Sequence, residues 1–267
     1  MKKGTIGIAD SAFSGCYGIT SIKISSSVKY INTTPFFHCE NLQEISVAKK
    51  NKYYTSSEGV LFSKDKTELL RYPAAKKSME YQIPSGVKKI WSYAFDAASN
   101  LVELEIPDSV ISIGSHVFYQ SSCYEDSENW TDGLFYMGDW LIEADYNEVV
   151  GVFAIKEGTV GIADYAFDMC TDLSGVVLPS TLLMIGNGAF YDCKGLTAIE
   201  IPNNVTTIGE YSFAYCKSLS SVAIPDSVTD IGNNAFVNCD DDLIIHGYAG
   251  TAAEEYAVES GIYFEEL

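Results

Sequence analysis

A repeat of 23 residues constrains the fold of this chain more than any other feature. In its most regular part, residues 185–239, the unit reads Ile-Gly-x-x-Ala-Phe-x-x-Cys-x-x-Leu-x-x-Ile-x-Ile-Pro-x-x-Val, and it starts again at Ile208 and at Ile231. A strict period of this length is typical of a solenoid, in which each unit forms one turn of a coil. One unit alone cannot bury its apolar residues, so the coils have to stack.

Eight phenylalanines occupy one position of the repeat and mark about eight coils. They are Phe13, Phe36, Phe95, Phe118, Phe167, Phe190, Phe213 and Phe236. Most are 23 residues apart, but two gaps of 59 and 49 residues show that two inserts interrupt the repeat, at about 48–80 and 119–152. We therefore predict a single solenoid domain over residues 1–267, with a C-terminal cap at about 240–267.

Within each coil the pattern predicts two short strands and a turn. The alternation around Ile199 and Ile201 predicts a strand with its apolar side facing in, and Pro202 ends this strand because proline has no N–H to donate. Residues 205–208 predict a second short strand, after which Gly209 allows a bend. The Ala-Phe-x-x-Cys segment predicts a helical or 3₁₀ turn. The expected fold class is thus an α/β solenoid with a parallel sheet.

The two inserts share a hairpin pattern, and the chain ends in a helix pattern. Residues 59–72 place two apolar runs around a polar turn, and residues 133–142 repeat this arrangement. Thr251-x-x-Glu254 is typical of a capping box, and Gly261 is a suitable helix stop. We expect a short capping helix there, followed by one last strand at residues 262–264.

Six of the seven cysteines lie three residues after a repeat phenylalanine: Cys16, Cys39, Cys170, Cys193, Cys216 and Cys239. We predict a column of small buried thiols, because side chains on stacked coils point the same way and not at each other. Zinc is disfavoured, since there is no Cys-x-x-Cys pair and the three histidines are scattered. Ala98 and Ser121 stand at the cysteine position of two coils. Cys123 lies in the second insert, and we expect it to be the most reactive thiol.

The net charge of −19 excludes some partners. Nucleic acids and anionic membrane surfaces would repel the chain, and no run of 18 apolar residues could span a bilayer. There is no P-loop, dinucleotide fingerprint or Gly-x-Ser-x-Gly motif. Asp240-Asp241-Asp242 fits a charged turn better than a calcium loop. We therefore expect no cofactor, no metal site and no catalytic residues, with an unrecognised hydrolase as a remote alternative.

The repeat unit resembles the BspA-like class of leucine-rich repeats over nearly the whole chain. The Gly-Val-Leu-Phe run at 59–62 and the His-Gly-Tyr run at 246–248 are similar to that family as well. The resemblance implies a right-handed solenoid with a parallel sheet along one face. It also implies a bacterial protein that is secreted or displayed on the cell surface, since several members are adhesins for host matrix proteins or other bacteria. It supplies no ligand-binding residues.

The second insert and the outward face of the sheet supply the candidate partner-binding residues. Aromatic residues among acidic ones, as in the second insert, can hold sugars or peptides, and exposed aromatics mark interaction sites. The alternative is that Tyr136 and Trp140 pack the hairpin onto its coil. The candidate residues are Tyr124, Trp130, Tyr136, Trp140, Glu103 and Glu105.

These observations favour a non-enzymatic extracellular module that binds a protein or glycan partner in adhesion. The alternative is a structural spacer that displays another domain of a longer surface protein. For partners we expect no nucleic acid and no membrane insertion. We also expect a monomer, for which the uncapped first coil offers a means of end-to-end contact.

The first residues repeat a later part of the chain. Residues 2–13 match residues 156–167 at nine of twelve positions, and the later copy follows a hairpin insert. We therefore expect the natural protein to continue upstream, with a signal peptide that is removed on export. The first coil should then expose an apolar cross-section around Ile6, Ile8 and Phe13.

Overall fold

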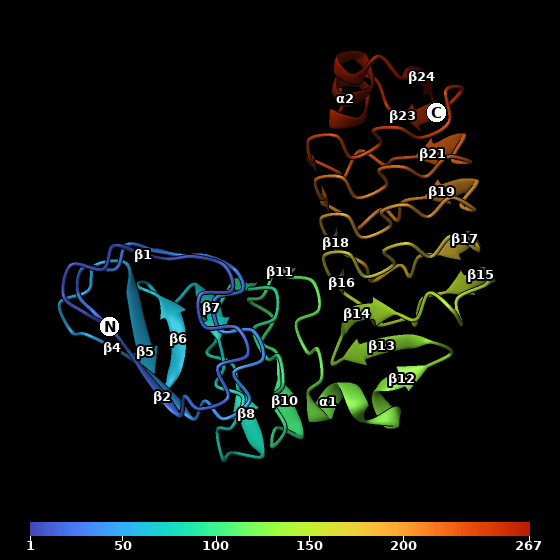
Figure 1. Cartoon of the computed structure of the whole chain (residues 1–267). Coiled ribbons are helices and arrows are strands. Elements are labelled where there is room, and N and C mark those ends of the chain that lie inside the picture. The colour runs from blue at the N-terminus through green and yellow to red at the C-terminus, as the bar shows by residue number, and fades with distance from the viewer. The chain divides into compact units, whose positions relative to one another are not determined.

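The computed structural model describes residues 1–267, which divide into two compact units, Met1–Asn129 and Trp130–Leu267. Both are built from coils whose short strands pair in parallel with the equivalent strands of the neighbouring coils. Figure 1 shows these coils stacked one on another in the second unit.

The first unit contains short strands and two single helical turns. Its elements are β1 (Gly7–Ile8), β2 (Ser21–Ile24), β3 (Tyr30–Ile31), β4 (Glu44–Val47), β5 (Tyr54–Ser57), β6 (Val60–Ser63), β7 (Glu68–Arg71), β8 (Glu80–Gln82), β9 (Lys89–Ile90), β10 (Glu103–Glu105), β11 (Ser112–Ile113), α1 (Ser122–Glu125) and the 3₁₀ turn η1 (Ser127–Asn129).

The second unit consists of short strands and one longer helix, which is followed by the last strand. Its elements are β12 (Trp130–Thr131), β13 (Leu134–Met137), β14 (Trp140–Ala144), β15 (Gly151–Ala154), β16 (Gly161–Ile162), β17 (Leu173–Val177), β18 (Met184–Ile185), β19 (Ala198–Glu200), β20 (Thr207–Ile208), β21 (Ser221–Ala223), β22 (Asp230–Ile231), β23 (Ile244–Gly247), α2 (Ala252–Ser260) and β24 (Tyr263–Glu266).

Two parallel ladders connect the coils, as the repeat predicts. In the second unit one sheet has the order β12-β13-β14-β16-β18-β20-β22, and another has the order β19-β21-β23-β24. The register joins residues 23 apart, so that Ile199 pairs with Val222. Ile199 and Ile201 are buried, which confirms the predicted strand. The apolar residues of successive coils thereby form one continuous core in this unit.

The turn that carries the column phenylalanine forms a third ladder. The predicted helical or 3₁₀ turn is present only as single i→i+3 hydrogen bonds, such as that from the Ala214 N–H to the Tyr211 carbonyl at 3.0 Å, and not as a regular helix. The N–H groups of Tyr211, Phe213 and Tyr215 donate to carbonyl oxygens of the next coil at 2.8–3.2 Å. Tyr211 and Tyr215 have left-handed backbones, with φ of 56° and 65°. A continuous helix cannot form here, because the left-handed residues at both ends of the segment interrupt it. The prediction that the phenylalanine points inward is confirmed, because Phe213 is fully buried.

The column phenylalanines stack face to face. In the second unit Phe167, Phe190, Phe213 and Phe236 have ring centroids 4.8–5.2 Å apart and planes within 9° of each other. In the first unit Tyr72, from the first insert, stacks on Phe95 at 5.2 Å. The first insert thus adds a ring to the column that it interrupts.

Both predicted hairpins are confirmed, and each has a third strand that the sequence did not reveal. β6 and β7 pair antiparallel, as do β13 and β14, and β5 and β12 add an outer strand to each hairpin. The second hairpin strand then joins the coil ladder, since β7 pairs in parallel with β9 and β14 with β16. Each insert therefore replaces part of a coil and leaves the stack continuous.

The repeat glycine has a different role from the one predicted. Gly209 does not have a positive φ, so the bend itself does not require glycine. A Cβ at Gly209 would lie 2.6 Å from the backbone of the preceding coil, and the equivalents Gly186 and Gly232 are as crowded. Glycine is required because two coils approach closely at this position.

The cysteine column is buried as predicted, and its thiols have a defined partner. The Sγ atoms of Cys193, Cys216 and Cys239 each donate to the carbonyl oxygen of a phenylalanine in the preceding coil at 3.1 Å. Cys39 makes the same contact at 3.0 Å, whereas Cys16 is only partly buried.

The prediction that Cys123 is the most reactive thiol is wrong. Its side chain is 1% exposed, and its Sγ lies 3.3 Å from the carbonyl oxygen of Leu101. Burial raises the pKa of Cys123 to about 11. Ser121, at the expected position of the column thiol in this coil, caps α1 instead by accepting the N–H of Tyr124.

We expect thiol labelling of the folded protein to follow this burial. The thiolate is the reactive species, and burial raises the pKa of Cys170 and of Cys239 to about 12 each. A short pulse of iodoacetamide at pH 8 should modify Cys16 first and leave Cys123 and Cys193 unmodified, as peptide mass spectrometry would show. Labelling in denaturant is the control. Modification of Cys193 at the rate of Cys16 would contradict the burial.

At the N-terminal coil the predicted apolar exposure is only partly confirmed. Ile6 is 57% exposed and Phe13 is half-buried. Ile8, in contrast, is buried, because β1 pairs with β3 and brings this residue into the core.

The C-terminal helix, its stop and the last strand are confirmed. Gly261 ends α2 with φ of 69°, and β24 pairs in parallel with β23. The capping box is only half formed. The Glu254 carboxylate accepts the N–H of Gly250 at 2.7 Å, while the Thr251 hydroxyl donates to the Tyr248 carbonyl and makes no bond to the helix.

Candidate partner-binding surfaces

The six residues predicted to bind a partner fall in different units. Glu103, Glu105 and Tyr124 belong to the first unit, and the other three belong to the second.

Tyr136 and Trp140 do not offer their rings to a partner, and this part of the prediction is wrong. They are only 8% and 4% exposed. The Trp140 ring fills the space beside Gly161, where a Cβ would come within 2.4 Å of the ring. The Tyr136 hydroxyl accepts the N–H of Lys156 at 3.2 Å. Both side chains pack the hairpin against its coil, as the alternative proposed.

Tyr124 and Trp130 are half-buried and stay predictions. Trp130 stacks on Phe135, its partner across β12 and β13, with ring centroids 5.3 Å apart. Tyr124 lies in α1, in the other unit. Each ring therefore has part of its surface in solvent and part against its own hairpin or coil.

Glu103 and Glu105 are exposed on β10, as predicted, but they form no catalytic arrangement. Glu105 accepts a hydrogen bond from the Gln82 amide at 2.8 Å, and Glu103 lies opposite Glu80 on β8. The latter pair places two like charges side by side. No group of three or more His, Cys, Asp or Glu side chains in the structure is arranged to hold a metal ion.

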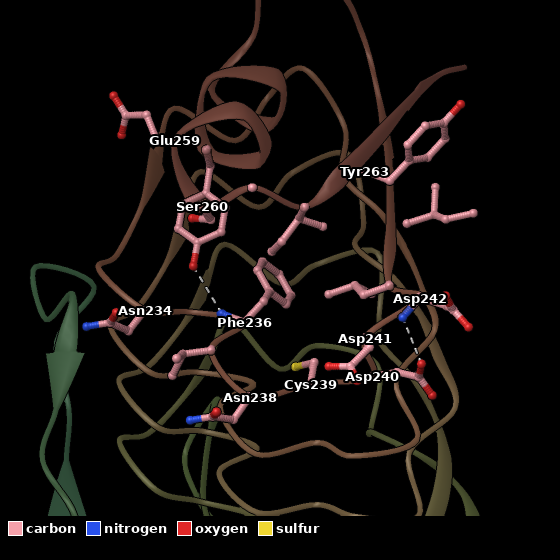
Figure 2. Close-up of a pocket in the computed structure, with 16 residues that line it drawn as sticks. Asn234, Phe236, Asn238, Cys239, Asp240, Asp241, Asp242, Glu259, Ser260 and Tyr263 are labelled. Carbon is pink, nitrogen blue, oxygen red and sulfur yellow. Dashed lines mark hydrogen bonds between the residues drawn. The ribbon is translucent and has the colours of Figure 1, made fainter.

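A groove of about 800 Å³ lies between α2 and the last coil (Figure 2). One side carries Asp240, whose carboxylate accepts the N–H of Asp242 at 2.9 Å and so closes the charged turn. On the other side, the Tyr256 hydroxyl accepts the N–H of Phe236 at 3.1 Å and ties the helix to the coil. These polar groups thus form hydrogen bonds within the C-terminal cap and its coil.

The first unit presents a cluster of half-buried rings on the outside of its phenylalanine turns. We call it the aromatic cluster, and its ring centroids lie 3.9–6.4 Å apart. Its members are Phe37, His38, Tyr93, His116 and Tyr119.

A buried ion pair lies against the aromatic cluster. Arg71 Nη2 is 2.8 Å from Asp96 Oδ2, and the side chains are 5% and 0% exposed. The main-chain N–H of His38 donates to the same carboxylate oxygen at 2.8 Å. The guanidinium also donates to the main-chain carbonyl of Tyr93. The ion pair thus fixes the backbone at two positions of the aromatic cluster.

The second unit carries a row of tyrosines at the same positions of the repeat, which we call the tyrosine stripe. Tyr191 has its ring centroid 6.0 Å from that of Tyr165 and 5.2 Å from that of Tyr215. The Tyr211 hydroxyl accepts a hydrogen bond from the Asn234 amide at 3.0 Å. Tyr165, Tyr211 and Tyr215 are 36–38% exposed.

Sequence reasoning missed both sets of rings. Their spacing was the available signal. Each ring lies two residues before, one residue after or two residues after a column phenylalanine. Only the structure shows that these rings lie on the outer side of the turn.

A family comparison identifies the repeat. The model of the BspA type leucine rich repeat region matches residues 1–79, 74–129 and 146–247, in six copies. The chain belongs to the BspA-type leucine-rich repeat family. The resemblance and the fold class expected from the sequence are both confirmed. The BspA-type repeats take in both units, including the aromatic cluster and the tyrosine stripe.

Solved structures of bacterial leucine-rich repeat proteins are similar to this chain, with low TM-scores. A leucine-rich repeat protein from Eubacterium ventriosum is 28% identical, with 83% of this chain and 59% of that chain covered and a TM-score of 0.40. A leucine rich cell surface protein from Faecalibacterium prausnitzii is 25% identical, with 97% and 61% covered and a TM-score of 0.37. The chain thus spans about three fifths of these relatives. No curated protein matches it significantly.

The helices of this BspA-type protein are short. None has the length and apolar character needed to cross a membrane.

Proposed function

We propose that this BspA-type repeat protein is a non-enzymatic extracellular module that binds a protein or glycan partner in adhesion. One observation carries the proposal: half-exposed aromatic rings gather on the outside of successive coils in each unit, as the aromatic cluster and the tyrosine stripe. Rings that stand together at a surface favour interaction sites, because they bury large area at small loss of conformational freedom.

The construction of the coils supports this proposal. Three ladders of hydrogen bonds hold each turn to the next, so side chains on the outside are presented by a rigid scaffold. A preorganised surface loses less entropy on binding. The family membership supports a location outside the cell, as stated for BspA-like proteins above.

The test is a binding screen of the full chain. We expect the immobilised protein to bind at least one member of a panel of matrix proteins, mucins and glycans, measured by biolayer interferometry. One variant would carry Tyr93→Asn with Tyr119→Asn, and a second would carry Tyr211→Asn with Tyr215→Asn. At least one of them should lose the partner.

Three results would count against the proposal. Binding that survives in both variants would show that the rings are not the site. Absence of binding across the panel would favour the structural spacer. Hydrolysis of a pooled substrate would favour an enzyme.

A further inference from the structure

The whole net charge of the protein belongs to the second unit. Residues 130–267 hold 22 of the 36 acidic residues but only 3 of the 17 lysines and arginines, which leaves a net charge of −19. Residues 1–129 hold 14 of each kind and are neutral. A surface potential of one sign raises the local concentration of oppositely charged partners and speeds their association. The second unit therefore selects for positively charged partners.

Carboxylates stand beside the rings of the tyrosine stripe. Partial burial raises the pKa of Tyr165, and the charges of Asp164 and Asp168 raise it further. The pKa of Tyr191 is raised as well, first by desolvation and then by the neighbouring Tyr215 and Asp192. The stripe thus combines aromatic faces with negative charge, the two features that bind an ammonium or guanidinium group.

The chain already makes both contacts with its own lysines. Lys217 Nζ lies 5.9 Å from the centroid of the Tyr215 ring. Lys194 Nζ lies 2.9 Å from a carboxylate oxygen of Asp192, and the Lys194 side chain is largely exposed. These contacts have the geometry that a cationic side chain of a partner would use.

The backbone gives no reason for tyrosine at these positions. Tyr165, Tyr211 and Tyr215 have φ between 56° and 65°, a conformation that bulky residues adopt rarely. The equivalent positions in neighbouring coils hold Gly188, Asn234 and Asn238, which adopt it more readily. The coil geometry therefore imposes this conformation, and it does not explain why tyrosine stands there.

We propose that the tyrosine stripe binds an arginine- or lysine-rich segment of a protein partner. Guanidinium or ammonium groups stack on the exposed faces of Tyr165, Tyr211 and Tyr215 and pair with the carboxylates of Asp168 and Asp192. The inference rests on the proposed function, because it names the partner class and the site of that binding module. A neutral glycan held by the rings alone is the competing occupant.

The probe is a fluorescein-labelled peptide of alternating arginine and glycine, titrated with the full chain and followed by fluorescence anisotropy. The comparison peptide has citrulline in place of arginine, which keeps the shape and removes the charge. We expect the citrulline peptide to bind at least about tenfold more weakly than the arginine peptide. Binding of the arginine peptide should also weaken as salt rises from about 0.05 to 0.3 M, because salt screens exposed charges.

The decisive variant carries Tyr165→Gly, Tyr211→Asn and Tyr215→Asn, which places at each position a residue that the neighbouring coils already accept there. We expect it to keep the wild-type melting temperature or exceed it, and to bind the arginine peptide at least about tenfold more weakly. The control is Tyr263→Asn, an exposed tyrosine on β24 in the same acidic unit, and its binding should be unchanged. If the triple variant does not fold, Asp168→Asn with Asp192→Asn tests the same site.

Equal binding by the triple variant and the wild type would show that net charge alone attracts the peptide, and would overturn the inference. Equal binding of the citrulline peptide, or no binding of either peptide, would overturn it too. A partner found in the binding screen that binds the triple variant normally would leave the proposed function standing without this site.

Discussion

Phe213→Ala is expected to lower the free energy of unfolding by about 3–5 kcal/mol, as deletion of a buried aromatic ring does. Phe213 is fully buried and stacks between Phe190, at 5.1 Å, and Phe236, at 5.2 Å. The backbone of this turn is held by its ladder, so the coil cannot collapse to fill the space. Chemical denaturation followed by circular dichroism would measure the change.

The matched control is Tyr248→Ala, which removes an aromatic ring that is 46% exposed in the same unit. A surface substitution of this kind should change stability by about 0.5 kcal/mol or less. An unchanged melting temperature for Phe213→Ala would mean that the phenylalanine column does not support the stack.

Asp96→Ala should destabilise the first unit by about 3–5 kcal/mol, because it leaves the buried Arg71 guanidinium without its counter-ion. The substitution also removes the acceptor for the main-chain N–H of His38. Adding Arg71→Met to Asp96→Ala should recover part of the loss, since the uncompensated buried charge is then absent. Thermal unfolding of the wild type and of these two variants would measure the loss and its recovery.

Asp192→Ala supplies the control for this prediction. It breaks the ion pair with Lys194, in which the side chains of Lys194 and Asp192 are 53% and 16% exposed, and a pair at the surface contributes about 0–1 kcal/mol. If Asp96→Ala were as mild as Asp192→Ala, the Arg71–Asp96 pair would not be holding the turn beneath the aromatic cluster.

The inserts show where prediction from sequence reached its limit. The hairpins were predictable because two apolar runs around a polar turn describe them locally. The burial of Trp140 was not, because it depends on the space beside Gly161 in the following coil. Cys123 was misjudged for a similar reason: its burial depends on α1 and on the Leu101 backbone of the preceding coil, against which its Sγ lies.

The binding surfaces were predictable only in part. The exposed positions of Glu103 and Glu105 follow from strand alternation, and the concentration of acidic residues in residues 130–267 can be counted from the chain. The tyrosine stripe could not be assigned to a surface, since a helical turn was expected where Tyr211 and Tyr215 adopt left-handed backbones.

The sequence by itself determined the stacking of the coils. Equivalent residues recur every 23 positions, so each coil meets its own pattern in the next one, and only the in-register pairing of Ile199 with Val222 buries both apolar faces. The tertiary structure alone decided which rings outside the repeat core face solvent. Which rings face solvent depends on backbone conformation and on the space left by neighbouring coils. The 23-residue period predicts neither of these.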